Sequence, residues 1–290
     1  MLYAFQPAAF RVKTFPMPSP STAILSALAQ EQHGLIDLLK SPIKRVHAGR
    51  DFWQGELHGQ PVVLALSRIG KVAAATTATA LIEKFGVGRI VFTGVAGGLG
   101  DGVQTGDVVV ASDFMQHDLD ASPLFARYEV PLYGQTRFAS DPQLTELLFG
   151  AAGSALVALH ASNTFTGARV HRGLVASGDR FVSSAGESAA LRAALLNSGH
   201  EVLAIEMEGA AVAQVCHDYG VPFAAVRTIS DCADDSAHVD FPAFVEQVAS
   251  RYARAIVVHF LQLLSNKQLH TPVLPGLQSL SPVILTSHAS

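Results

Sequence analysis

Two glutamates flank a methionine where a predicted apolar strand turns into an alanine-rich helix, at Glu206, Met207 and Glu208. Strand-to-helix junctions are the places where open α/β sheets build ligand sites. The exposed N–H groups at a helix start also favour a negative charge. A carboxylate here can therefore hold hydroxyl groups, stabilise a developing cation or simply cap the helix. Other residues of the chain are needed to distinguish these roles.

Other polar or aromatic side chains follow the ends of predicted strands. Glu31, Phe181 and Asp231 each come shortly after such a strand, as Glu208 does. A glycine-rich turn at Gly94–Gly100 would let the backbone approach a ligand closely. Since strand ends converge on one crevice of an open sheet, we expect these groups to face one site. Three carboxylates without a cluster of histidine or cysteine suit acid–base chemistry on an uncharged polar substrate.

Each of these residues, taken alone, has a plainer interpretation. Glu31 fits a solvated residue in the first turn of a helix, and Asp231 fits a helix or turn cap. Met207 and Phe181 fit a hydrophobic core. Only their joint occurrence favours a functional site.

No chemical role is predicted for Glu206. On an extended segment it would point with Glu208, but the turn at the helix start breaks that alternation. Arg227, close to the end of a predicted strand, has three open interpretations. It pairs with Glu208, it holds a water, or it only satisfies loop carbonyls.

The composition narrows the class of protein. The chain has 290 residues, of which 49% are hydrophobic, and a formal net charge of -4, so no basic face for nucleic acid is expected. Its two cysteines, Cys216 and Cys232, indicate no disulfide framework and suit the reducing cytoplasm. No apolar run reaches the roughly 18 residues of a membrane span and no signal peptide is recognised, so no membrane partner is expected.

No metal or cofactor is predicted. His117, Asp118 and Asp120 could suggest a metal, but no second cluster joins them in the sequence, which favours hydrogen bonds within a loop. The glycine-rich turn does not match the G-x-G-x-x-G fingerprint, and no acidic residue follows it at the distance that a dinucleotide site needs.

Apolar strands that alternate with helices predict the fold. Strands are expected at residues 22–29, 52–57, 61–67, 89–95, 107–111, 172–177, 202–205 and 222–229. Helices are expected at 30–40, 71–85, 141–151, 188–196, 208–219 and 244–264, and an irregular loop at 113–140. Continuous apolar strands are typical of a sheet buried on both faces, and a hairpin around residue 58 adds antiparallel strands. We therefore predict an α/β fold, a single domain with a central mixed twisted β-sheet flanked by helices. It spans residues 21–265, between an N-terminal extension at 1–20 and a C-terminal tail at 266–290.

Six motifs occur in the order and at the spacing of a known family. They are Ile69-Gly70-Lys71-Val72, Thr93-Gly94-Val95-Ala96-Gly97-Gly98, Gly106-Asp107-Val108-Val109, Ser177-Gly178-Asp179, Glu206-Met207-Glu208 and Arg227-Thr228-Ile229-Ser230-Asp231. On this set the chain resembles the nucleoside phosphorylase/nucleosidase superfamily, and within it the 5′-methylthioadenosine/S-adenosylhomocysteine nucleosidases. The resemblance extends from Ile24 to Leu264 and implies the nucleoside phosphorylase fold.

The resemblance implies an N-glycosyl hydrolase that acts on 5′-methylthioadenosine and S-adenosylhomocysteine. Such an enzyme releases adenine and the thioribose through an oxocarbenium-like transition state. The resemblance makes Asp231 the acid that protonates adenine at N7, with a raised pKa, and Glu31 the acceptor of a proton from the attacking water. It makes Glu208 the anion that binds the ribose hydroxyls.

The other residues that the resemblance assigns bind the substrate, an adenine thionucleoside. Met207 packs on the ribose, Phe181 stacks on adenine, and the Val182 backbone hydrogen-bonds the edge of the base. The substrate-binding set is completed by Ala96, Gly97, Arg227 and Phe241. Phe241 and the 113–131 loop are expected to line the alkylthio pocket, and in the family that loop reaches across a homodimer interface.

Two positions depart from the family pattern. Val95 stands where members often have a serine close to the attacking water, so water placement or substrate preference is expected to differ. Leu28 replaces a methionine, which is a mild, volume-conserving change.

Three alternatives stay open. In a phosphorolytic purine nucleoside phosphorylase, phosphate replaces water and needs arginines or clustered N–H groups. The phosphorylases place an arginine where this chain has Thr93, but Arg68 lies close to another possible anion site. The second alternative is a hydrolase of another 6-amino nucleoside, such as an aminofutalosine. The third is a noncatalytic nucleoside-binding protein on the same scaffold, which the presence of all three carboxylates disfavours.

Overall fold

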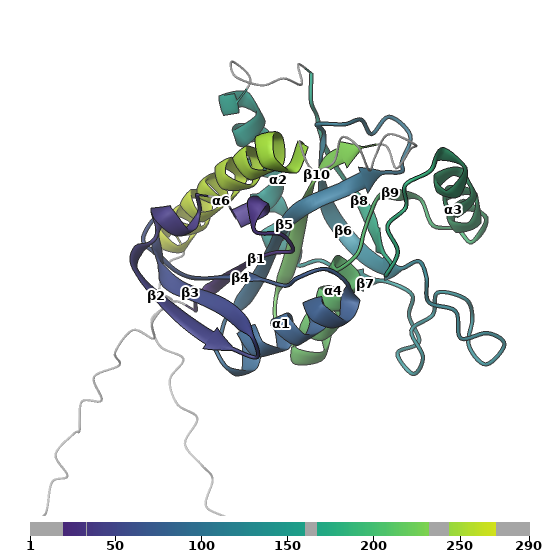
Figure 1. Cartoon of the computed structure of the whole chain (residues 1–290), viewed down its shortest axis with the longest axis horizontal. Coiled ribbons are helices and arrows are strands. Elements are labelled where there is room, and N and C mark those ends of the chain that lie inside the picture. The colour runs from purple at the N-terminus through teal and green to yellow at the C-terminus, as the bar shows by residue number, and fades with distance from the viewer. Residues whose placement is uncertain (1–19, 33, 160–166, 232–243, 271–290) are drawn as a thin grey trace, which may run out of the picture.

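The computed structural model describes residues 20–32, 34–159, 167–231 and 244–270, and one ten-stranded sheet runs through them (Figure 1). The strands are β1 (Thr22–Ser26), β2 (Lys40–His47), β3 (Arg50–Leu57), β4 (Gln60–Leu66), β5 (Arg89–Gly98), β6 (Val108–Gln116), β7 (Phe138–Ala139), β8 (Val170–Ser177), β9 (Val202–Glu206) and β10 (Phe223–Asp231). The helices are α1 (Lys71–Glu83), α2 (Pro142–Leu159), α3 (Ala185–Asn197), α4 (Gly209–Tyr219) and α6 (Ser250–His270). Shorter helical segments are η1 (Gln30–Gln32), η2 (Ile36–Leu38) and the π-helix η4 (Val245–Ala249).

The sheet is mixed and partly closes on itself. Its strand order is β10-β6-β8-β9-β5-β1-β4-β3-β2, with β7 beside β6. Because β10 also pairs with β5, the strands β5, β10, β6, β8 and β9 form a closed ring. The pairs β1–β4, β1–β5 and β5–β10 are parallel, whereas β2–β3, β3–β4, β10–β6 and β5–β9 are antiparallel. The predicted α/β fold with a mixed sheet is therefore confirmed.

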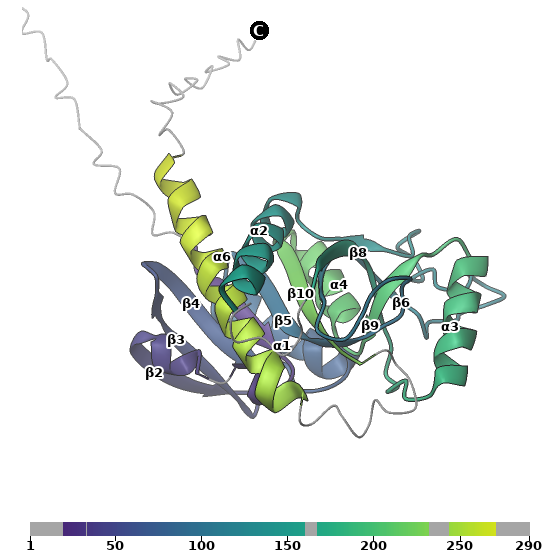
Figure 2. The same cartoon turned by 90° about the horizontal axis from the view of Figure 1, so that it is seen from above.

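Helices cover both faces of this sheet. In Figures 1 and 2, α1 and α4 lie on one face and α2 and α6 on the other. Successive strand side chains point to opposite faces. Leu25 and Phe92 accordingly belong to the core under α1 and α4, and their neighbours Ile24 and Val91 belong to the core under α2 and α6. Burial on both faces explains why these strands read as continuous apolar runs.

Helix α2 is the one helix in the described part of the chain that is long and apolar enough to cross a membrane, with a mean hydropathy of 1.2 over 18 residues. In the structure its buried stripe, which includes Leu144, Leu148 and Ala152, packs in the core beside α6. This is the environment of a core helix.

The helix expected at 30–40 is wrong. The turns η1 and η2 occupy this segment, and the strand β2 begins at Lys40. Gly34 lies between the two turns with a φ of 76°, a left-handed conformation that stops a helix. Strand β2 was not predicted, because all of its residues are exposed and Pro42 fits only an edge strand.

The glycine-rich segment at 94–100 is not a turn throughout. Strand β5 continues to Gly98 and pairs with β9 through Gly97 and Gly98. A Cβ on Gly94 would lie 3.0 Å from Glu31 Oε1. The missing side chain at Gly94 thus leaves room for a carboxylate against the strand.

The remaining elements lie where the sequence pattern predicts them, with bounds that differ by a few residues in either direction. β6 extends to Gln116 and β7 occupies Phe138–Ala139, which shortens the expected irregular loop, and α2 continues to Leu159. The final helix begins as the π-helix η4 and ends at His270.

Candidate active site

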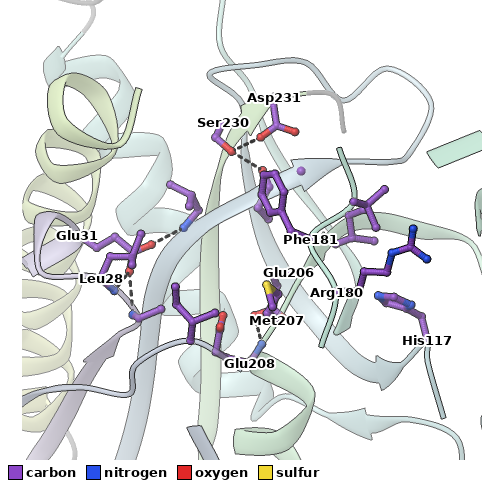
Figure 3. Close-up of a pocket in the computed structure, with 17 residues that line it drawn as sticks. Leu28, Glu31, His117, Arg180, Phe181, Glu206, Met207, Glu208, Ser230 and Asp231 are labelled. Carbon is purple, nitrogen blue, oxygen red and sulfur yellow. Dashed lines mark hydrogen bonds between the residues drawn. The ribbon is translucent and has the colours of Figure 1, made fainter. Parts of the chain in front are cut away.

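A cavity of about 360 Å³ opens at the carboxyl ends of β1, β5, β8, β9 and β10 (Figure 3). The carboxylates of Glu31, Glu208 and Asp231 reach its wall from three sides. The wall also contains the predicted residues Met207, Phe181, Val182, Ala96 and Gly97. Arg227 is not a lining residue. Phe241 lies outside the described residues.

Glu31 stands in η1, directly after β1, and is almost completely buried. Its Oε2 accepts the N–H groups of Ala27 at 2.8 Å and Leu28 at 2.9 Å, and its Oε1 accepts that of Val95 at 3.1 Å. Burial raises the pKa of Glu31, against these hydrogen bonds and the nearby Arg227 charge, which lower it. Glu31 is therefore a buried carboxyl with a raised pKa, which makes it a better proton acceptor than an exposed glutamate.

Position 95 contacts Glu31 through its backbone. The Val95 N–H holds the carboxylate, whatever the side chain at this position. The Val95 side chain lines the cavity and offers no hydroxyl to a water there.

Glu208 is the N-cap residue of α4, yet its side chain makes no capping hydrogen bond. Its Oε1 instead accepts the Gly70 N–H at 2.8 Å, from the turn before α1. Burial, and then the negative charge of Glu206, raise the pKa of Glu208 to about 8. The helix-capping interpretation of Glu208 therefore fails, and its carboxylate is available to a ligand.

Glu206 does the capping in place of Glu208. Its Oε2 accepts the N–H groups of Glu208 at 3.1 Å and Gly209 at 2.8 Å. Its Oε1 accepts the hydroxyl of Ser177, from the neighbouring strand β8. This role of Glu206 was not predicted from the sequence. A carboxylate three residues before the glycine that opens a helix is the signal that could have found it.

Arg227 pairs with Glu206, an interpretation that was not among its three predicted ones. Its guanidinium lies 2.8 Å from Glu206 Oε2, and both side chains are almost fully buried. It also donates to the Phe92 carbonyl at 3.2 Å and stacks on the Phe92 ring at 4.1 Å. Arg227 therefore supports the floor of the site through Glu206.

Asp231 ends β10 and is buried beside Ser230. The Ser230 hydroxyl lies 2.6 Å from Asp231 Oδ2 and 3.3 Å from the Ala96 carbonyl (Figure 3). The Ser230 hydroxyl donates to Asp231 Oδ2, and its contact with the Ala96 carbonyl is the longer of the two. Ser230 therefore orients the Asp231 side chain at the end of β10.

The rim of the cavity carries an exposed aromatic side chain. Phe181 follows β8 and is 45% exposed, whereas the next residue, Val182, is buried. An exposed ring over a cavity with polar groups inside suits the stacking of a flat, partly apolar ligand.

The cavity wall also contains residues for which no site role was predicted from the sequence, among them Ala27, Ile69, His117, Arg180 and Ile205. The Arg180 guanidinium pairs with Glu187 at 2.9 Å and lies across the cavity from Glu31 (Figure 3).

Asp118 and Asp120 take part in hydrogen bonds within and around their loop, whereas the buried Nε2 of His117 has no hydrogen-bond partner among the described residues. Asp118 accepts Lys71 Nζ at 2.5 Å and the Asp179 N–H at 2.9 Å, and Asp120 accepts the Ser122 N–H at 3.0 Å. Among the residues that the structure describes, no three histidine, cysteine or acidic side chains form a group that could hold a metal.

Known proteins resemble this chain over most of its length. A family model described as the phosphorylase superfamily matches residues 21–262. A 5′-methylthioadenosine/S-adenosylhomocysteine nucleosidase of Chromohalobacter salexigens is 36% identical over 234 residues, which cover 81% of this chain and 94% of the relative. One of Bacillus thuringiensis subsp. konkukian is 37% identical over 240 residues, which cover 81% and 96%.

Solved structures agree with these relatives. The Neisseria meningitidis 5′-methylthioadenosine/S-adenosylhomocysteine nucleosidase in complex with methylthio-immucillin-A is 37% identical and has a TM-score of 0.73, with 84% of this chain and 99% of that chain covered. A futalosine hydrolase of Helicobacter pylori is 31% identical, with a TM-score of 0.72 and 84% and 98% covered.

Proposed function

The chain belongs to the phosphorylase superfamily and, within it, to the 5′-methylthioadenosine/S-adenosylhomocysteine nucleosidases, and from this premise we propose its reaction. It hydrolyses the N-glycosidic bond of 5′-methylthioadenosine and S-adenosylhomocysteine and releases adenine and the thioribose. The observation that carries this function is the convergence of Glu31, Glu208 and Asp231 on one cavity.

The reaction needs a protonated leaving group and an activated water. Asp231 donates a proton to N7 of adenine, so that the base leaves as a neutral molecule with the electron pair of the N9–C1′ bond. Water adds to C1′ of the oxocarbenium-like sugar, and Glu31 accepts the proton that the water loses. The role of Asp231 as the acid is supported by its buried place in the cavity wall, where the Ser230 hydroxyl orients its carboxyl group. The raised pKa of Glu31 supports its role as the acceptor.

The other lining residues bind the nucleoside. Glu208 binds the ribose hydroxyls. Its ionised form, which is favoured above its pKa of about 8 in the empty protein, opposes the positive charge of the transition state from nearby, which is electrostatic stabilisation. Met207 packs against the sugar and Phe181 stacks on adenine. The backbone of Val182 hydrogen-bonds the base, beside Ala96 and Gly97. Phe241 and the 113–131 loop line the alkylthio pocket.

Water, rather than phosphate, is the attacking group. Three N–H groups, those of Ala27, Leu28 and Val95, converge as they would at a phosphate site. The carboxylate of Glu31 already occupies this cluster and would repel an anion. The hydrogen bonds to Glu31 therefore favour hydrolysis over phosphorolysis.

The arginines near the site support the same choice. Arg68 donates to the Gly49 carbonyl, and Arg227 is paired with Glu206. Arg180, the one arginine that lines the cavity among the described residues, lies across from Glu31. A phosphate beside Glu31 would therefore lack the arginine that such a site needs.

The assembly that we propose is a homodimer in the cytoplasm, in which the 113–131 loop of one chain reaches the alkylthio pocket of its partner. Leu124 of this loop and Leu132, directly after it, are 85% and 91% accessible, and such apolar surface supports a protein contact. The catalytic domain is residues 21–265, flanked by the N-terminal extension and the C-terminal tail.

One assay tests the reaction. 5′-Methylthioadenosine, S-adenosylhomocysteine and an aminofutalosine are each incubated with the protein, with and without added phosphate. We expect adenine and free methylthioribose from the first substrate, at a rate that phosphate does not change. A sugar 1-phosphate would assign the protein to the phosphorylases, and binding without adenine release would support the noncatalytic alternative.

A further inference from the structure

The two glutamates that flank Met207 differ in how their oxygens are used. Glu206 accepts hydrogen bonds from the Glu208 and Gly209 N–H groups, from the Ser177 hydroxyl and from Arg227. A carboxylate has about four lone-pair sites, so Glu206 has no free acceptor left for a substrate. Its place in the cavity wall is therefore not evidence that it binds the nucleoside.

The Glu208 carboxylate, in contrast, accepts few hydrogen bonds from the protein. Among the described residues, only the Gly70 N–H donates a hydrogen bond to its carboxylate, and this bond goes to Oε1. The other oxygen keeps its acceptor capacity for ribose hydroxyls. A carboxylate held at one oxygen and open at the other can be both fixed and available to a ligand.

The first turn of α4 is also tied to Glu206. The N–H groups of Glu208 and Gly209 bond to it directly. The next N–H, that of Ala210, donates at 2.7 Å to the Ser177 oxygen, whose own proton goes to Glu206. The first N–H groups of a helix have no partner within the helix, so a helix start moves easily unless side chains hold it. Three consecutive N–H groups here lead to one carboxylate.

Arg227 completes the arrangement. Its positive charge offsets the negative charge of the buried Glu206 carboxylate. The ion pair of Arg227 is therefore with Glu206 and not with Glu208. Without Glu206, the guanidinium would be a buried charge without its carboxylate, close enough to act on Glu208.

We propose that Glu206 is a positioning residue of this site: paired with Arg227, it holds the first turn of α4 so that Glu208 need not cap its own helix and presents an open oxygen to the ribose. This inference rests on the proposed function, because it assigns the ribose to Glu208. Within one short motif, Glu206 then has a structural role and Glu208 binds the ligand.

The main test is the substitution Glu206→Gln, which keeps the size of the side chain and removes its charge. We expect folded protein with kcat/KM for 5′-methylthioadenosine lowered about 10- to 100-fold, as for other residues that orient a ligand-binding group. The matched control is Glu146→Gln, which removes the carboxylate of an exposed pair with Arg172 and should leave kcat/KM unchanged.

The pH profile separates positioning from a general loss of stability. The charged groups that act on Glu208 are Glu206, Arg227 and Glu31. Removing the Glu206 charge lowers the pKa of Glu208, so the ionisation of Glu208 in the pH profile of kcat/KM should shift to lower pH in Glu206→Gln. A folded variant with the kcat/KM and the pH profile of the parent would overturn the inference.

A second variant decides the question if Glu206→Gln does not fold. Ser177→Ala keeps the Glu206–Arg227 pair and removes the link to the Ala210 N–H. We expect its KM to rise about 2- to 10-fold, the effect of one lost hydrogen bond, and an unchanged KM would overturn the inference. A crystal structure of either variant adds a readout that needs no activity, because the Glu208 carboxylate should turn away from Gly70. If the parent protein itself releases no adenine, the proposed function fails, and only the orientation of Glu208 then tests the inference.

Discussion

At the scale of single residues, chemistry in this cavity depends on which donors reach each carboxylate. Glu31 is held by three backbone N–H groups, Glu208 by one, and Asp231 by a hydroxyl. These partners make the three acids unequal, although all of them are buried. Unequal acids are what a reaction needs that both donates and accepts protons.

The substitution Asp231→Asn should keep the fold and remove most adenine release. An amide can still accept the Ser230 hydroxyl, but it has no carboxyl proton to give to N7. We expect kcat to fall by about 10²- to 10⁴-fold, the usual contribution of a general acid. The check is adenine release alongside thermal unfolding, with the surface variant Asp51→Asn, which only breaks an exposed pair with Lys44, as the control. Near-parental turnover by Asp231→Asn would remove Asp231 from the mechanism.

Glu208 should make the empty protein less stable as the pH rises. Its pKa is raised from 4.5 to about 8, first by burial and then by the charge of Glu206. Within this window the folded protein keeps a proton that the unfolded chain has released, so the free energy of unfolding falls with rising pH. The stabilising contribution is complete below 4.5 and is lost as the pH passes through about 8.

Thermal unfolding from about pH 5 to about pH 9 checks this dependence. The melting temperature of the parent protein should decline more steeply than that of Glu208→Gln, in which the titrating group is absent. Equal slopes in the two proteins would contradict the raised pKa of Glu208.

At the scale of elements, the start of α4 is where packing and catalysis meet. Gly209 opens the helix, and a Cβ there would lie 2.3 Å from Cε1 of the buried Phe114 ring. The absent side chain lets the helix start approach β6, while the N–H of Gly209 bonds to Glu206. Close packing against Phe114, and not helix propensity, therefore requires glycine at position 209.

The substitution Gly209→Ala should destabilise the protein, against the usual helix preference for alanine. Overpacking against a ring costs about 1–3 kcal/mol, which exceeds the gain of about 1 kcal/mol from propensity. The shift of the helix start should also lower kcat/KM. The control is Gly153→Ala in α2, where nothing lies within 4 Å of the new Cβ, so stability should rise slightly. Denaturant unfolding of the two variants measures both changes in the free energy of unfolding. A stabilised Gly209→Ala would show that the Phe114 ring can move aside.

At the scale of the whole molecule, closure of the sheet brings the site together. The ring of β5, β10, β6, β8 and β9 places the ends of distant strands around one cavity, and β1 adds Glu31 beside β5. Large apolar side chains are exposed on the molecule, among them Val72 at 78% and Leu132 at 91%. Exposed apolar groups of this size favour association of two chains.

The substitution Leu132→Asp should shift the protein from two chains to one. A charge in an apolar contact is costly to desolvate, so the proposed homodimer would dissociate. Sedimentation velocity gives the mass directly. Val157→Asp on α2 is the matched control, because Val157 is also an exposed apolar residue, at 79%, on a helix that the proposed contact does not use. A monomeric parent protein would refute the dimer.

Much of this molecule can be predicted from the sequence because the signals are local. Apolar runs and alanine-rich segments predict most strands and helices, since burial on both faces leaves no solvent-exposed position in a strand such as β10. The ordered motifs also predict which carboxylates to examine. Strand β2 escapes prediction, because an exposed edge strand has no periodic pattern to recognise.

Only the tertiary structure decides what the two glutamates around Met207 do. In the sequence they are equivalent acids two positions apart. In the structure Glu206 accepts hydrogen bonds from Ser177 of β8 and Arg227 of β10, whereas Glu208 accepts one from the Gly70 N–H, 138 residues away. Hydrogen-bond donors that come from distant parts of the chain leave no trace in local spacing, so capping and ligand binding could be assigned only after the strands had been brought together.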